Sequence, residues 1–277
     1  MSDSTPDNPG EEAAEQGPRP APGPRPRPDR ARIGLAIVVP VLIVAALVAV
    51  FVSRDNEPAP LAEDRLLQYC STAIERDALE LPDPSEAASE EVKNGVPVTA
   101  GRMVLLTERM LEVSPDRQKP ELRKQVAAYR SLVRSRDPAG FTAPELLESL
   151  NQVGNAVAAT CEMQKVDFAV SQFRYVDFPR ELEAGRASFS MRNESNEAHQ
   201  MVLFRRNAEF GGPFAEILES GQVGERATRV ALGRADPDRT DVMAVELLVG
   251  DYALTCFIKS GPEEHWEKGE IAEFNVH

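Results

Sequence analysis

Histidine, cysteine and tryptophan are scarce in this chain of 277 residues, which has three His, three Cys and one Trp. The chain also lacks the short motifs of common enzymes: a glycine-rich phosphate loop, an HExxH pair, a CxxC pair and a serine nucleophile elbow. Acidic neighbours such as Glu90 and Glu91 are adjacent rather than facing, which is typical of a solvated surface. We therefore expect a protein that is not an enzyme.

Basic clusters are also missing after residue 54, and the formal net charge of the chain is −14. Proteins that bind nucleic acids draw most of their affinity from grouped Lys and Arg side chains that contact phosphates. We therefore expect no nucleic-acid partner.

The N-terminal part differs in composition from the rest. Residues 1–32 are rich in proline and polar residues, which predicts a disordered cytoplasmic tail. The following stretch, Ile33–Ser53, is uncharged and almost wholly apolar, and it is long enough to cross a bilayer as a helix. Arginines precede this stretch, so the positive-inside rule predicts a single-pass protein of the plasma membrane with its C-terminal part outside. The lipid bilayer would then be a partner through residues 33–53.

Residues 54–165 have apolar side chains at helical spacing, as in Leu66, Tyr69, Cys70 and Ala73. About four helices are predicted, the third over about 115–137 and the fourth opening at Thr142, which has capping-box spacing with Glu145. The gaps between helices are expected at Pro82, Pro84, Pro97, Pro138 and Gly140. This pattern favours a small up-and-down bundle.

Residues 166–277 have the alternation of strands, as in Ala187, Phe189 and Met191. Further strands are predicted over 168–175, 200–205, 242–248, 252–258 and 271–276, with a short helix over 214–219. The fold class expected is α+β multidomain, with one transmembrane helix, a small helical bundle and a C-terminal Greek-key β-sandwich.

The end of the chain carries a recognisable order of residues. Gly250-Asp-Tyr-Ala-Leu-Thr-Cys256 is followed by His265, then by Lys268-Gly269-Glu270, and then by a closing strand through Phe274 and Val276. Upstream, Asn193 is followed by His199 and an apolar strand. This order resembles the cupredoxin family, and most closely bacterial membrane-attached or secreted proteins with a helical N-terminal region and a C-terminal cupredoxin-like domain.

The resemblance implies a copper site with His199, Cys256 and His265 as ligands. Copper that changes oxidation state favours two imidazoles and a thiolate, with a weaker axial donor. In that family the axial ligand is usually Met after Gly, whereas here Gly269 is followed by Glu270. Either Glu270 is a hard, anionic axial donor that lowers the reduction potential, or it faces solvent and the domain holds no copper.

The loop over 258–264 is polar and long for this family. It would either close over the site or leave it open to water. Each ligand candidate also has an ordinary structural interpretation: His199 and His265 as surface residues, and Cys256 as a buried apolar residue or half of a disulfide.

The three cysteines allow three pairings and leave one residue free. An up-and-down bundle places its first and last helices side by side, which favours a disulfide between Cys70 and Cys161. Cys256 would then keep the free thiol that a copper ligand requires. A bond from Cys256 to either helical cysteine would remove that ligand.

Two functional hypotheses lead. The first is an extracytoplasmic cupredoxin-like protein that binds one copper ion for electron transfer or copper handling, with a redox or copper-carrying protein as partner. The second keeps the cupredoxin fold without a metal, as an interaction or structural module at the cell surface. A third, a redox enzyme with an open copper position, would need a second metal centre or a substrate cleft, and the sequence shows neither.

Overall fold

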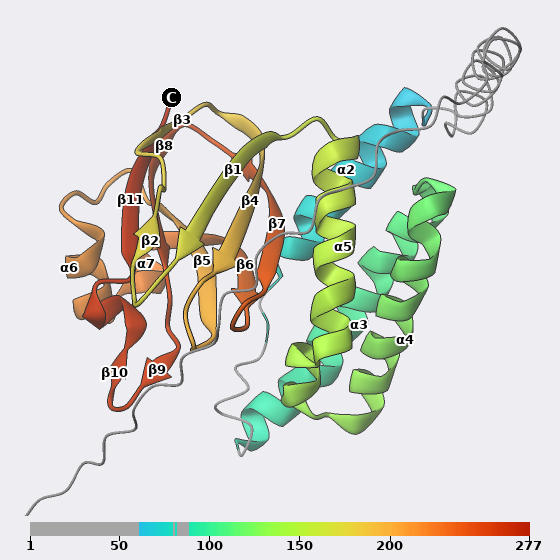
Figure 1. Ribbon diagram of the computed structural model, residues 1–277, viewed down its shortest axis with the longest axis horizontal. Helices are drawn as coiled ribbons and strands as arrows, with labels where there is room; N and C mark the ends of the chain where they lie inside the picture. The colour runs from blue at the N-terminus through green and yellow to red at the C-terminus, as the bar shows by residue number, and fades with distance from the viewer. Residues whose placement is uncertain (1–60, 80, 82–88) are drawn as a thin grey trace, which may run out of the picture. The chain divides into compact units, whose positions relative to one another are not determined.

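The structure, a computed structural model, describes residues 61–79, 81 and 89–277. Within these residues the longer helices precede the strands (Figure 1). The longer helices are α2 (Glu63–Asp77), α3 (Glu90–Val113), α4 (Lys119–Ser135) and α5 (Pro144–Thr160), and 3-10 turns lie at Asp116–Gln118 and Pro138–Thr142. The disulfide expected between Cys70 and Cys161 is present and joins α2 to the C-terminal end of α5.

Two helix boundaries differ from those predicted. Helix α3 continues through Pro97, where a gap between helices was expected, because buried side chains before and after the proline, such as Val96 and Ala100, hold the helix in the core. Helix α5 begins at Pro144 after Ala143, and Thr142 does not cap it. The Thr142 hydroxyl instead donates to the carbonyl of Ala139 within the preceding 3-10 turn.

The C-terminal part is a sandwich of two mixed sheets. The smaller sheet has the order β2-β1-β4-β7 and the larger has the order β3-β11-β8-β5-β6. The smaller sheet comprises β1 (Gln164–Val170), β2 (Tyr175–Val176), β4 (Gly185–Asn193) and β7 (Thr240–Leu247). The larger comprises β3 (Glu181–Leu182), β5 (His199–Arg206), β6 (Ala227–Ala235), β8 (Gly250–Thr255) and β11 (Ile271–Val276). The pairs β1 with β4 and β3 with β11 are parallel, and the other paired strands are antiparallel.

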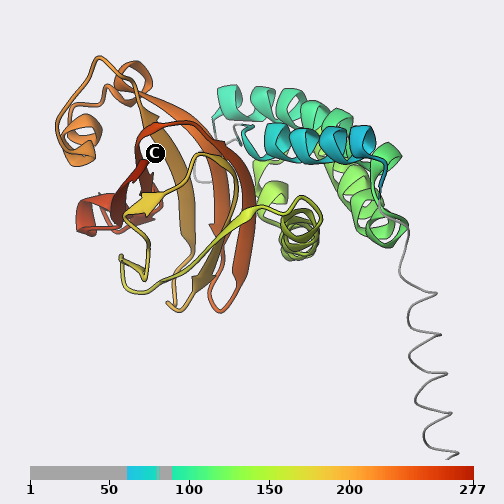
Figure 2. The same ribbon diagram turned by 90° about the horizontal axis from the view of Figure 1, so that it is seen from above.

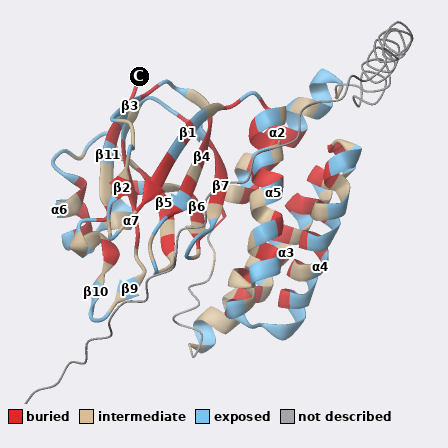
Figure 3. Cartoon of the chain, in the orientation of Figure 1, coloured by how far each residue is buried: buried red, intermediate tan, exposed pale blue. Residues whose placement is uncertain are grey.

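Shorter elements interrupt the sandwich. These are α6 (Phe214–Glu219), as predicted, α7 (Val223–Arg226), the hairpin of β9 (Lys259–Ser260) and β10 (Glu263–Glu264), and the 3-10 turn η4 (His265–Lys268). The apolar core between the sheets includes Phe189, Met201, Leu203 and Leu254, all fully buried. Figure 3 shows the long strands of the two sheets, such as β1 and β4, as largely buried.

The membrane part of the predicted fold class and location is corrected. Among residues 61–79, 81 and 89–277, every helix is too short or too polar to cross a bilayer. Helices such as α2 and α4 are amphipathic, with a buried face and charged residues elsewhere. The fold described is therefore a set of helices followed by a β-sandwich-like part, and the single-pass location is not retained. The stretch 33–53 and the tail 1–32 lie outside the described residues.

Helices α2 and α5 pack against β7, the edge strand of the smaller sheet (Figures 1 and 2). Gly154 allows the close approach of α5, because a Cβ atom there would lie 2.7 Å from the carbonyl oxygen of Val242. On α2, the carboxylate of Asp77 accepts a hydrogen bond of 2.9 Å from the backbone N–H of Ala244. An edge strand has unpaired backbone groups, and Asp77 satisfies one of them.

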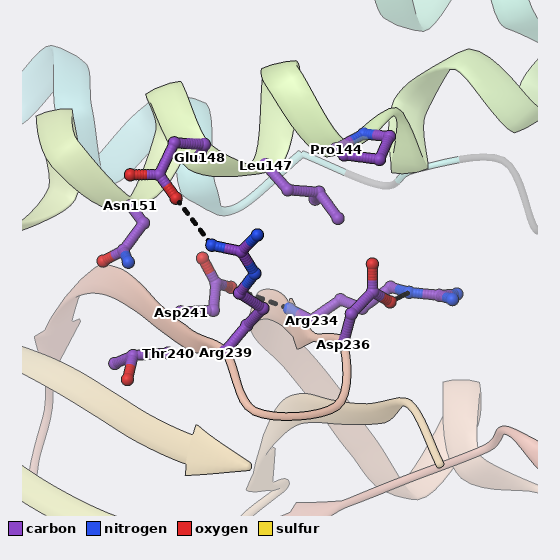
Figure 4. Close-up of a pocket in the computed structure, with 9 residues that line it drawn as sticks. All are labelled: Pro144, Leu147, Glu148, Asn151, Arg234, Asp236, Arg239, Thr240 and Asp241. Carbon is purple, nitrogen blue, oxygen red and sulfur yellow. Dashed lines mark hydrogen bonds and ion pairs between the residues drawn. The ribbon is translucent and has the colours of Figure 1, made fainter. Parts of the chain in front are cut away.

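A buried carboxylate lies beside this contact, at the start of β7. Asp241 accepts a 2.7 Å hydrogen bond from the backbone N–H of Arg234, and it borders a cavity of about 40 Å³ that Glu148 and Arg239 also line (Figure 4). Burial raises the pKa of Asp241 from 3.8 to about 6, although the hydrogen bond from Arg234 acts in the opposite direction. The folded state therefore holds this proton more tightly than the unfolded chain does.

This pKa predicts a pH dependence of folding. The stabilisation from protonated Asp241 is complete below about pH 4 and is lost as the pH rises through about 6. The loss is at most about 3 kcal/mol, since one pKa unit corresponds to about 1.4 kcal/mol. Urea unfolding between pH 4 and pH 7 should show this loss in the wild type and not in Asp241→Asn. The control is Asp238→Asn, at an exposed position in the loop between β6 and β7. Equal pH profiles for all three proteins would contradict the expectation.

Candidate metal centre

The sheet topology brings the predicted ligand residues to one end of the larger sheet. Strand β8 lies between β5 and β11 and is antiparallel to both, so its C-terminal end meets the N-terminal ends of its two neighbours. His199 is the first residue of β5, Cys256 follows the last residue of β8, and Glu270 precedes β11. His265 opens the 3-10 turn η4 that leads into Glu270.

The four side chains form one compact, buried cluster. Each of the residues His199, Cys256, His265 and Glu270 offers one potential ligand atom, and these atoms all lie within 4.8 Å of one another. All four residues have zero relative exposure to solvent. The structure therefore brings together all four residues that the sequence nominated, while His277 is exposed at the end of the chain.

Both histidines turn the Nδ1 atom toward the cluster. The Nδ1 atoms of His199 and His265 are 3.2 Å apart, and they lie 2.7 Å and 3.1 Å from the same Glu270 oxygen, Oε2. The Sγ atom of Cys256 lies 3.4 Å from Nδ1 of His265. Two nitrogens, a sulfur and a carboxylate oxygen thus converge, which is a donor set that binds first-row metal ions.

The other ring nitrogens contact the loop between β4 and β5. The Nε2 atom of His199 lies 2.7 Å from the hydroxyl of Ser195, and Nε2 of His265 lies 3.1 Å from Oε2 of Glu197. A carboxylate accepts hydrogen bonds, so this contact is satisfied when Nε2 of His265 carries a proton, and Nδ1 would then be the nitrogen that coordinates a bound metal ion. Metal-bound histidines commonly have such an outer partner.

Cys256 is the free cysteine among the described residues, and its thiol is buried. Its Sγ atom accepts a hydrogen bond of 3.3 Å from the backbone N–H of Gln200, the residue after His199. Burial raises the pKa of the Cys256 thiol, and the charge of Glu270 raises it further. A thiol in these surroundings forms its thiolate readily only when a cation is bound beside it.

The carboxylate of Glu270 provides the test of whether these residues fit a metal ion. Among the hydrogen-bond partners that the described residues offer, none satisfies its buried Oε1 atom, while Oε2 contacts both imidazoles. A buried carboxylate is costly unless a cation or donors compensate it. Burial lowers the pKa of His265, as does His199, while Glu270 raises it. A bound cation would compensate Glu270 without a proton on this imidazole, so the residues fit a metal.

Aromatic and loop residues cover the cluster. The ring of Phe173, in the turn between β1 and β2, lies 4.7 Å from the ring of His265 and 6.2 Å from that of His199, measured between centroids. The ammonium of Lys268 lies 4.7 Å from the centroid of the Phe173 ring. Ser260, in the β9–β10 hairpin, donates to Oε1 of Glu197. Loop 258–264 therefore contacts the outer layer of the cluster through Ser260.

The residues of this outer layer were not identified from the sequence. Ser195 and Glu197 lie four and two residues before His199, and Phe173 lies in a different part of the chain. Proximity to a predicted histidine was the available signal for the first two. Phe173 has no comparable signal, because its place over the rings depends on a turn in which Gln172 and Phe173 both have positive φ angles.

A search of solved structures finds proteins that are similar to part of this chain. An auracyanin from Roseiflexus castenholzii has 16% identity and a TM-score of 0.31, over 41% of this chain and 97% of that one. Auracyanin A, a blue copper protein from Chloroflexus aurantiacus, has 15% identity and a TM-score of 0.30, over 41% and 98%. A multicopper oxidase from Pediococcus acidilactici has 14% identity and a TM-score of 0.25, over 42% and 26%. These neighbours are cupredoxins and multicopper oxidases.

Two other comparisons give no relatives. No model of a protein family matches the chain, and no curated protein matches it. The cluster of two histidines, a cysteine and a glutamate is by its own geometry consistent with copper.

Proposed function

We propose that the chain binds one copper ion through His199, Cys256, His265 and Glu270 and serves in electron transfer or copper handling. The observation that supports this most is the convergence of the four ligand atoms within 4.8 Å in a fully buried cluster. When bound, copper supplies a centre that accepts and releases one electron. The protein contributes the donor atoms, their orientation and the exclusion of water.

The choice of ligands favours the oxidised ion. The Cys256 thiolate and the Glu270 carboxylate together carry two negative charges, which balance the charge of Cu²⁺ and exceed that of Cu⁺. A neutral thioether in place of Glu270 would carry no charge and would suit the softer, reduced ion better. We therefore propose that the site has a low reduction potential, and that Glu270 is the ligand that lowers this potential most.

The burial of the cluster supports a role without catalysis. His199, Cys256, His265 and Glu270 are all inaccessible to solvent, and Phe173 lies over both imidazoles. A substrate would have no route to the ion while this cover is in place, whereas an electron can leave through the surrounding groups. The proposed partner is accordingly a redox or copper-carrying protein.

Copper titration of the full chain tests the proposal. We expect about one copper per chain and a visible absorption band from thiolate-to-copper charge transfer. Cys256→Ser should lose the band and most of the affinity, because a hydroxyl is a poor substitute for a thiolate ligand. The matched control is His277→Ala, which removes an exposed histidine outside the cluster and should load like the wild type.

Three outcomes would contradict the proposal. One is copper loading that Cys256→Ser leaves unchanged, and another is the absence of any loading. The third is retention of zinc in place of copper, because the same donor atoms also suit tetrahedral Zn²⁺.

One contact favours the second candidate, a metal-free interaction module. The 2.7 Å distance between Nδ1 of His199 and Oε2 of Glu270 would allow a protonated imidazole to balance the carboxylate without a metal. In that case copper would leave the thermal stability of the chain unchanged. A metal that binds only the folded state instead raises the stability with its concentration.

A further inference from the structure

The loop between β4 and β5 is held by side-chain hydrogen bonds in a conformation that places Glu197 next to the cluster. The side-chain amide of Asn193 donates to the carbonyls of Glu197 at 2.7 Å and of Ala235 at 3.0 Å. The side-chain oxygen of Asn193 accepts from the backbone N–H and the hydroxyl of Ser195. One buried asparagine thus fixes both residues whose side chains contact the distal nitrogens of the two histidines.

Both oxygens of the Glu197 carboxylate are engaged. Oε2 lies 3.1 Å from Nε2 of His265, and Oε1 accepts a hydrogen bond of 3.2 Å from the hydroxyl of Ser260. The His265 side chain is 0% exposed, whereas the Glu197 side chain is 41% exposed. Glu197 therefore lies between the buried imidazole and solvent, and a second loop holds it there.

The two histidines have outer partners of different charge. Nε2 of His199 contacts the neutral hydroxyl of Ser195, which can accept the ring N–H and donate its own proton to Asn193. Nε2 of His265 contacts a carboxylate. A carboxylate partner fixes the tautomer and the ring orientation of a ligand histidine and makes its other nitrogen a stronger donor. His265 should accordingly be the stronger imidazole donor of the pair.

We propose that Glu197 is a positioning residue for His265, which holds the imidazole with Nδ1 directed at the ligand cluster and adds a negative charge behind it. As a role at a metal ligand, this inference rests on the proposed copper site. Glu197 does not itself reach the cluster of ligand atoms. It acts through the ring of His265, by orientation and by charge.

Two substitutions of Glu197 separate these effects. Glu197→Gln keeps an oxygen that can accept from Nε2 and removes the charge, so the ring orientation should persist while the reduction potential rises. Glu197→Ala removes both, and we expect copper affinity to fall by roughly 10-fold to 100-fold, the usual effect of losing an outer partner. Glu263→Gln is the matched control, because Glu263 is exposed and its substitution removes the same charge.

The readouts are copper affinity, reduction potential and the ¹⁵N shifts of the histidine rings in the metal-free full chain. In the wild type, Nε2 of His265 should be the protonated nitrogen. Glu197→Ala should change the ring signals of His265 and leave those of His199, whose partner is Ser195. A Glu197→Ala protein that matches Glu263→Gln in affinity, potential and His265 shifts would overturn the positioning role.

The ring signals also separate this inference from the copper proposal. If the wild type binds no copper but Glu197→Ala still shifts the His265 signals, the copper function fails and the positioning of His265 stands. If the wild type binds copper and Glu197→Ala changes neither the affinity nor the ring signals, the positioning role fails and the copper function stands.

Discussion

Loss of the disulfide between Cys70 and Cys161 is expected to lower the free energy of unfolding by about 4.6 kcal/mol, as judged from the length of the loop it closes. The two cysteines are 91 residues apart in sequence, and the loop between them contains the C-terminal part of α2 and all of α3, α4 and α5. Without the bond, the unfolded chain gains the conformational freedom of this loop. The folded helices keep their other contacts.

Urea unfolding of the oxidised and the reduced chain measures this effect, with the double variant Cys70→Ala/Cys161→Ala as a second route to the same state. Cys256→Ala is the control, because it removes a buried sulfur that takes no part in the bond. Reduction should lower the free energy of unfolding of Cys256→Ala by the same amount as it lowers that of the wild type. A difference below about 1 kcal/mol between oxidised and reduced wild type would show that the bond adds little to the folded state.

Glu270→Met is expected to raise the reduction potential of the copper-loaded chain by at least about 59 mV, which corresponds to a tenfold change in the relative affinity for the two oxidation states. The substitution exchanges a buried anionic oxygen for a neutral thioether of similar length. The oxidised ion loses a charge partner, and the reduced ion gains a soft donor. Both changes act in the same direction.

Voltammetry of the loaded proteins gives the potentials, and Glu270→Gln separates the two causes. The amide keeps an oxygen donor without the charge, so its potential should lie between those of the wild type and Glu270→Met. A potential that falls or stays the same in Glu270→Met would mean that Glu270 is not a ligand and that its charge does not act on the ion.

The order of the His, Cys and Glu residues along the chain was enough to predict which four residues form the cluster. His199, Cys256, His265 and Glu270 stand at strand ends, and antiparallel pairing of β8 with both β5 and β11 is enough to bring such ends together. The free state of Cys256 followed from assigning the other two cysteines to neighbouring helices. Glu197 could not be recognised in the same way, because it belongs to no motif and only its proximity to His199 in the sequence set it apart.

The sequence predicted some elements of the fold correctly and missed others. Helix α6 has the bounds expected, whereas β6 was missed, because its buried positions are the small residues Ala227, Ala231, Gly233 and Ala235 rather than the β-branched residues typical of strands. The sequence also predicted a gap between helices at Pro97, but tertiary packing lets α3 continue through this residue. The spacing of apolar residues in the sequence therefore identifies a helix or strand best where the buried side chains are large.

X-ray absorption at the copper edge of the loaded full chain tests the central claim most directly, because it reports the atoms bound to the ion. We expect one sulfur, two imidazole nitrogens and one oxygen, with the sulfur contribution absent in Cys256→Ser. A wild-type spectrum with only nitrogen and oxygen neighbours would show that copper binds elsewhere on the chain and would contradict the site at the end of the larger sheet.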